Sequence, residues 1–149
     1  MDKTDDSHRI WVQQARCFLL AAALAGSAVA LGAFQAHGLQ GFLERSGLTP
    51  DMVTKRLGQF EVGVRYHFYH ALALAAFAPL PLVFWNRPFR LAVSLLAVGT
   101  AIFSGSLYLL VLLNVPILGA VTPLGGVLQI SGWIVAGLSV LQLSLGRKK

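Results

Sequence analysis

The fold of this chain is decided by residues 91–146, which read LAVSLLAVGTAIFSGSLYLLVLLNVPILGAVTPLGGVLQISGWIVAGLSVLQLSLG. That stretch contains no Lys, Arg, Asp, Glu or His. A helix that crosses the hydrocarbon core of a bilayer needs about 20 apolar residues, so the stretch is long enough for two. Asn114-Val115-Pro116 is the natural break, because Asn and Pro favour turns. The sequence therefore predicts two consecutive membrane spans, at about 91–113 and 121–145.

The composition of the whole chain agrees with a membrane protein. Of its 149 residues, 56% are hydrophobic and 12% are charged, whereas about a quarter of the residues in soluble domains are charged. The net charge of +6 raises nucleic-acid binding as an alternative. The basic residues are scattered through tails and short loops, however, and a nucleic-acid site gathers them on one face. We expect a single membrane domain over residues 1–149 that contacts the lipid bilayer and no nucleic acid.

A first apolar stretch, at about 17–36, follows a polar tail at 1–16. It is long enough for a span. A secretory signal is the alternative, with Arg16 as its basic part and Ala28-Val29-Ala30 as its cleavage site. The apolar run is long for a signal and continues past Ala30, which favours an uncleaved helix. Small residues repeat along it at four-residue spacing and predict a face for close helix packing, namely Ala22, Gly26 and Ala30.

The connection to the second span carries signals for a helix end and a helix start. Gly38 is placed to cap the end of the first helix. Thr49 and Pro50 are placed as the N-cap and first residue of the next. Apolar residues then recur at helical spacing, opposite charged ones, at Val53, Leu57 and Phe60. We expect a short amphipathic helix over 49–60 on the non-cytoplasmic surface or against the bundle, leading into a second span at about 66–85.

The second span ends near two prolines and a polar turn. Pro79 and Pro81 predict a kink or an early helix end. Trp85 opens the turn that follows, and we expect it at the membrane interface. Eight Lys and Arg lie in the tails and in this turn, against four between the first two spans. Because basic loops stay in the cytoplasm, both termini are predicted to be cytoplasmic, with the tails at 1–16 and 146–149.

A candidate polar cluster lies where the first span ends and the second begins. Successive spans are antiparallel, so those two ends share one membrane face. The cluster contains His37, Glu61, Arg65, Tyr66 and His70. One interpretation is a site at the outer face that binds a metal or small ligand or relays protons. The other is structural: His and Tyr place rings in the apolar zone and polar tips in water, and hold two helices together.

Catalytic signatures are missing from the sequence. There is one cysteine, Cys17, and no His-x-x-x-His, so no spacing typical of a metal site occurs. No phosphate-binding glycine loop or nucleophile motif occurs either. We therefore expect no enzymatic activity, no metal and no cofactor. The polar residues of the third and fourth spans are expected to form interhelical hydrogen bonds, and these are Ser104, Ser106, Gln129 and Gln142.

Read together, four segments resemble, in order, the motifs of the domain-of-unknown-function family 423, to which animal transmembrane protein 256 belongs. These segments are LGAFQAHGL at 31–39, FEVGVRYHFYHALA at 60–73, FSGSLY at 103–108 and LGAVTPLGG at 118–126. The resemblance extends over about residues 17–145. The chain departs from the family at Gln35, usually Gly there, and at His67, often Gln or a similar residue there. The five residues of the candidate cluster match the family's pattern.

The resemblance implies a small bacterial membrane protein with four helices and implies no activity. We therefore expect an all-α, integral membrane four-helix bundle in the bacterial plasma (inner) membrane. Its expected role is that of a structural or accessory subunit, of the membrane, of a larger complex or of a homo-oligomer. The alternative is a ligand-, metal- or proton-handling site at the outer face, built on His37 and His70.

Overall fold

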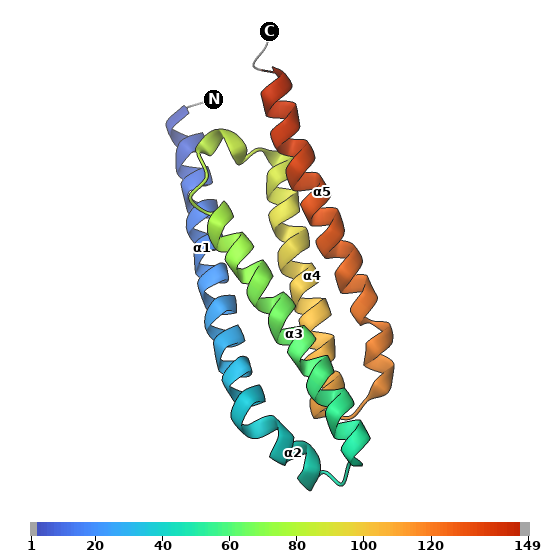
Figure 1. Ribbon diagram of the computed structural model, residues 1–149. Coiled ribbons are helices and arrows are strands. Elements are labelled where there is room, and N and C mark those ends of the chain that lie inside the picture. The colour runs from blue at the N-terminus through green and yellow to red at the C-terminus, as the bar shows by residue number, and fades with distance from the viewer. Residues whose placement is uncertain (1–2, 147–149) are drawn as a thin grey trace.

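The computed structural model describes residues 3–146, and within them the chain is helical without strands. Four long helices run up and down (Figure 1), which confirms the predicted all-α class and the number of long helices. The predicted basic end at 147–149 lies outside the described residues. In chain order the elements are α1 (Lys3–Phe34), η1 (Gln35–Leu39), α2 (Gln40–Arg45), α3 (Pro50–Phe77), η2 (Leu82–Phe84), α4 (Arg87–Leu112), η3 (Pro116–Ala120) and α5 (Thr122–Gly146).

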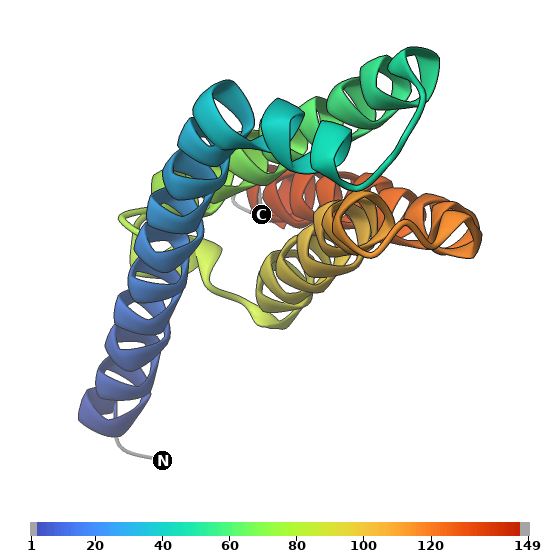
Figure 2. The same cartoon turned by 90° about the horizontal axis from the view of Figure 1, so that it is seen from below.

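The long helices pack in a row. α1 packs on α3, α3 on α4, and α4 on α5, and in the described residues α1 has at most marginal contact with α4 or α5. Figure 2, seen along the molecule, shows α1 standing apart from the α4–α5 pair. Consequently α3 is covered on two sides only and keeps an outward face.

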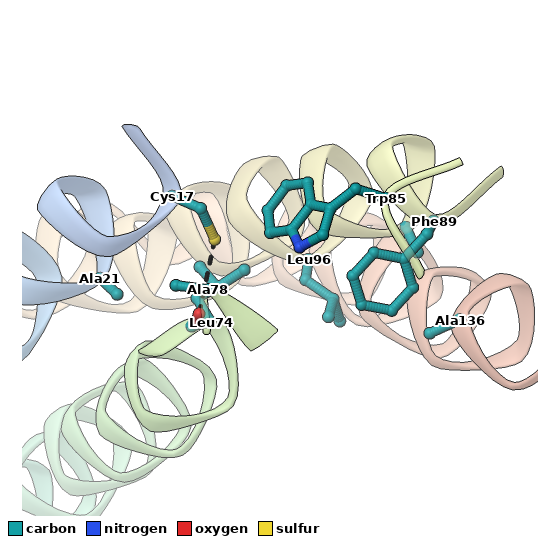
Figure 3. Close-up of a cluster of buried hydrophobic side chains, with 9 residues drawn as sticks. Cys17, Ala21, Leu74, Ala78, Trp85, Phe89, Leu96 and Ala136 are labelled. Atoms are coloured by element: carbon teal, nitrogen blue, oxygen red, sulfur yellow. Dashed lines mark hydrogen bonds between the residues drawn. The ribbon is translucent and has the colours of Figure 1, made fainter. Parts of the chain in front are cut away.

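One end of the row is held by a cluster of buried apolar side chains (Figure 3). The thiol of Cys17 on α1 points at the carbonyl oxygen of Leu74 on α3, 3.4 Å away. Trp85 is 3% exposed and packs edge-on against Phe89, with ring centroids 5.7 Å apart. The ring of Trp85 is therefore turned into the bundle, while its position at the membrane interface stays a prediction. The polar residue next to it, Asn86, caps α4: its side chain accepts a hydrogen bond from the backbone N–H of Phe89.

The opposite end contains a wide helical turn that the sequence did not reveal. The first helix does not end at Gly38: it passes through the π-helical turn η1 into α2 and stops at Arg45. A Cβ on Gly38 would lie 3.0 Å from the ring of Phe34, so glycine makes room for that ring inside the turn. Gly47, with φ +75°, ends the helix instead.

α3 starts where the sequence predicts and is longer than expected. The Thr49 hydroxyl accepts a hydrogen bond from the N–H of Met52, and the helix then continues without interruption to Phe77. A separate short helix over 49–60 is therefore not present. Val53 and Phe60 are buried against the neighbouring helices, while a position of this segment at the membrane surface stays a prediction. The helix ends shortly before Pro79 and Pro81, in agreement with the predicted early end.

α4 and α5 are in very close contact. A Cβ on Gly125 would lie 2.4 Å from the backbone N of Phe103, and one on Gly99 would lie 2.9 Å from the backbone N of Gln129. Two hydrogen bonds cross the same interface, from Gln129 to Thr100 (3.4 Å) and between the Ser106 and Thr122 hydroxyls (2.8 Å). The predicted interhelical role of Ser106 and Gln129 is thus confirmed.

α1 packs with a different face from the one predicted. Ala21 and Ala28 are buried, and Gly32 faces Val64 of α3. The small residues at four-residue spacing are on the exposed side of the helix, namely Ala22, Gly26 and Ala30. Small residues are frequent all round this helix, so spacing alone selects the wrong stripe.

Three helical stretches in the described residues are long and apolar enough to cross a membrane: Ser7–Arg45, Arg87–Leu112 and Pro116–Leu145. α3 has the length of a span, but charged side chains are spread over its first sixteen residues, namely Asp51, Lys55, Arg56, Glu61 and Arg65. It is the helix on which the candidate site residues gather.

Candidate functional site

The packing of α1 against α3 fixes which residues lie at the same height. At one end the Gln14 side chain donates to the carbonyl of Leu80, 2.7 Å away. At the other end the rings of Phe34 and Phe60 are 6.1 Å apart, centroid to centroid. The helices are antiparallel, so the part of α3 from about residue 60 to 77 runs alongside the apolar stretch of α1.

His37 does not join the other predicted site residues. It lies on η1 with an exposed side chain, at the height of about residue 57 of α3. His70 is about thirteen residues further along α3, which at 1.5 Å per residue is about 20 Å. No hydrogen bond among the described residues joins His37 to the other four. The sequence-based placement goes wrong because α3 begins at Pro50 rather than near Tyr66, so His70 lies deep in the helix instead of at its start.

The other four predicted residues share α3 and divide between two of its sides. Glu61 and Arg65 form an ion pair one turn apart, and each side chain is 51% exposed. Tyr66 is 42% exposed and packs on Phe103 of α4, with centroids 4.9 Å apart. The charged pair thus faces outward, while Tyr66 lies at the edge of the α3–α4 contact.

His70 is turned into the protein. Its Nδ1 lies 2.8 Å from the carbonyl oxygen of Tyr66, and the indole N–H of Trp133 on α5 donates to its Nε2 over 3.4 Å. A carbonyl only accepts and an indole N–H only donates. These partners therefore select the neutral ring with its proton on Nδ1, and His70 ties α3 to α5.

His67 is not one of the five predicted cluster residues, and its side chain is buried in the structure. Its Nδ1 lies 3.1 Å from the Tyr108 hydroxyl on α4. Its Nε2 is buried and has no hydrogen-bond partner among the described residues. The signal that places it inside is spacing, since the buried residues of α3 recur in steps of three and four, at Phe60, Gly63, His67, His70 and Leu74.

A second residue missed in the sequence is Arg56. Its position in the sequence predicts the charged side of the helix, opposite Val53, Leu57 and Phe60, yet it is 2% exposed. Its guanidinium donates to Asn114 across 2.7 Å and to Gln59 across 2.9 Å. Asn114 has φ +51° in the turn after α4, so this hydrogen bond fixes that turn to α3.

Among the described residues, none of the surface hollows found is lined by His67 or His70. A surface hollow of about 340 Å³ lies between α1 and the end of α3, lined by Trp11, Phe18 and Pro79 among others. It is apolar and does not include the α3 polar residues. No three His, Cys, Asp or Glu side chains gather closely enough to hold a metal within the part of the chain that the structure describes.

Comparison with known proteins identifies a family for this chain. Residues 31–126 match the model of a family described as protein of unknown function (DUF423). Those residues include the end of α1, all of α3 and α4, and the start of α5. No solved structure matches this chain.

Several curated relatives match most of the chain. The UPF0382 membrane protein YwdK of Bacillus subtilis is 45% identical over 72% of this chain and 81% of its own. The UPF0382 membrane protein of Haemophilus influenzae is 38% identical over 78% and 87% of the two chains. The UPF0382 inner membrane protein YgdD of Escherichia coli is 34% identical over 86% and 92%. This chain is an integral membrane protein of the DUF423 family.

Proposed function

We propose that this chain is a small accessory protein of the bacterial inner membrane, which acts by associating with another membrane protein and not by catalysis. In this proposal all four long helices cross the membrane and both termini are cytoplasmic. The observation that carries it is the outward-facing ion pair between Glu61 and Arg65, which lies alongside the apolar stretch of α1.

The position of that ion pair is unfavourable if lipid covers it. On insertion scales a charged side chain costs about 2.5–3.5 kcal/mol at the centre of a spanning helix, and less toward the end of the span, where Glu61 and Arg65 lie. An ion pair one turn apart on a helix contributes only about 0.2–0.5 kcal/mol. Pairing within α3 therefore does not offset the cost of facing lipid. A protein surface with polar groups of its own removes most of that cost.

The residues around the pair form a continuous outward stripe, which we call the α3 outer face. They are separated by steps of three and four, so they lie on one side of the helix. All of them are exposed: Gly58, Glu61, Arg65, Tyr69, Leu72 and Ala76. The stripe runs for most of the length of α3, as a helix–helix contact requires.

The experiment is native gel electrophoresis of the tagged chain, extracted from its own membranes in a mild detergent. We expect a complex larger than the 16.0 kDa chain, and its loss when Glu61→Gln and Arg65→Gln are combined. The matched control is Gln40→Ala with Glu44→Gln, which removes another exposed pair one turn apart, on α2. A chain that runs as a monomer in native extracts, or a complex that survives the loss of both charges, contradicts the proposal.

A second candidate function rests on the buried Nε2 of His67, which lacks a hydrogen-bond partner among the described residues. Buried polar groups in a membrane protein normally hydrogen-bond or serve a transported ion or ligand. We propose that this nitrogen of His67 binds one proton or ion between α3 and α4. The optical spectrum and metal content of the purified protein test for a metal or haem. A ligand-free protein that functions fully with His67→Leu excludes the candidate.

A further inference from the structure

We infer that the partner of the α3 outer face is a second copy of this chain, packed α3 against α3 about a two-fold axis that runs along the helices. In this arrangement Arg65 of each copy pairs with Glu61 of the other as well as with its own. The inference rests on the proposed function and names the partner.

Symmetry makes this face complementary to itself. Two copies inserted in the same direction place their α3 helices parallel, and a two-fold interface requires that if residue i meets residue j, then j meets i. Residue 61 of one copy lies level with residue 61 of the other, so Glu61 reaches the other copy's Arg65 diagonally, one turn further along the helix, and symmetry repeats that contact in reverse. Facing copies therefore bring together two carboxylates and two guanidiniums, with no net charge.

The geometry of a helix pair allows those contacts. Packed helices lie about 8–10 Å apart, and Glu61 and Arg65 differ in height by only about 6 Å. The Arg65 guanidinium has five N–H donors, so it can serve a carboxylate on each copy. The side chains at the two ends of the α3 outer face are small, with Gly58 at one end and Ala76 at the other. A Cβ on Gly58 would meet nothing within 4 Å. Small residues let helix backbones approach.

Other outward faces offer no comparable reason for pairing. The exposed side chains of α5 include Ile130, Leu138 and Leu141, which lipid covers without cost. The exposed side of α1 alongside α3 is likewise apolar, as Leu19 and Val29 show. Among the described parts of the long helices, the stretch level with apolar α1 shows Asp, Glu, Lys or Arg on α3 alone.

The direct test mixes two charge variants. Glu61→Arg gives a copy with two positive charges on the face, and Arg65→Glu gives a copy with two negative charges. Each is expected to lose self-association, with a dimer dissociation constant raised at least about tenfold, because the four charges brought together then all have the same sign and no attractive diagonal contact is left. Two differently tagged copies, one of each variant, are expected to associate again in vesicles when coexpressed. Glu44→Arg, on α2, is the control and is expected to associate as the unmodified chain does.

The outcomes separate this inference from the broader proposal. Unaltered self-association of both variants, or failure of the mixture to associate, overturns the α3 dimer. An unmodified chain that is monomeric but still captures a different membrane protein through Glu61 and Arg65 also overturns it, and leaves the proposed function standing. If the charge variants do not fold, as judged by circular dichroism, a cysteine test decides the question.

That test uses single cysteines in a Cys17→Ala chain. A disulfide needs Cα atoms about 4.4–6.8 Å apart, a separation that only residues facing the axis reach. Leu72→Cys, on the outer face, is expected to form a disulfide-linked dimer in native membranes. Leu138→Cys, equally exposed but on α5, is expected not to. Absence of the dimer at Leu72, or an equal yield at Leu138, contradicts the inference.

Discussion

Gly125 is the residue whose side-chain size is most tightly limited. A Cβ there would lie 2.7 Å from the Cα of Phe103 and 2.8 Å from the carbonyl oxygen of Gly99, and both are backbone atoms that cannot rotate away. We predict that Gly125→Ala separates α4 from α5 and destabilises the protein by about 1–3 kcal/mol. Thermal unfolding in detergent measures the loss.

Gly137 provides the matched control on the same helix. A Cβ at Gly137 would meet nothing within 4 Å. Since Ala favours a helix over Gly by up to about 1 kcal/mol, Gly137→Ala is expected to leave stability unchanged or to raise it. Equal destabilisation by the two substitutions would show that close contact at Gly125 is not what limits this helix pair.

The hydrogen bond from Arg56 to Asn114 is the second prediction at residue scale. Asn114→Gly removes the side-chain oxygen that accepts this hydrogen bond, and glycine tolerates the backbone angle of φ +51° at this position. Because the Arg56 guanidinium is charged and buried, we expect a loss of about 1.5–3 kcal/mol of unfolding free energy. In a chain that already carries Arg56→Met, the same Asn114→Gly change should cost much less. Equal costs in the two backgrounds, measured by chemical unfolding, would mean that the two side chains are not coupled.

The candidate site could be predicted from the sequence only in part, because some of its contacts depend on local spacing and others on residues far apart in the chain. Glu61 and Arg65 are one turn apart on any helix, so their pairing follows from spacing alone. The separation of His37 from His70 does not, because it depends on where α3 begins and on its height against α1. His67 and Arg56 are buried through contacts with Tyr108 and Asn114, which are distant in sequence.

At the scale of elements, the sequence predicts helix starts better than helix ends. Thr49 caps α3 by a local hydrogen bond, as its residue type predicts, whereas the cap that Asn86 provides for α4 was not predicted. The first helix continues past Gly38 because the ring of Phe34 packs against that glycine in a π turn, and tertiary packing of this kind leaves no local pattern. For the same reason the sequence predicts a separate helix over 49–60, although α3 continues without a break from Pro50 to Phe77.

The α3 helix itself gives the third prediction. Within one copy the Glu61–Arg65 pair is half exposed, so Glu61→Gln is expected to change the unfolding free energy of the dissociated chain by less than about 0.5 kcal/mol. The same substitution is expected to weaken association. Unfolding measured at high detergent, alongside association at low detergent, separates the two effects. A large loss of monomer stability would indicate that the pair supports the fold rather than an interface.

At the scale of the whole molecule, four crossings make a prediction about sidedness. With both termini cytoplasmic, a reporter fused after Lys149 and one inserted at Thr49 are expected on opposite sides of the membrane. The same side for both would mean that α3 does not cross. The test is informative because α3 is the long helix that hydropathy does not select as a span.

Whether protein covers the α3 outer face in the membrane is the central question, and photo-crosslinking from Leu72 answers it most directly. A photoreactive residue is placed at Leu72, which is 50% exposed on α3, and in a second chain at Leu138, which is 52% exposed on α5. After irradiation of native membranes, we expect protein adducts from Leu72 and lipid adducts from Leu138. Lipid adducts alone from Leu72 would contradict the account.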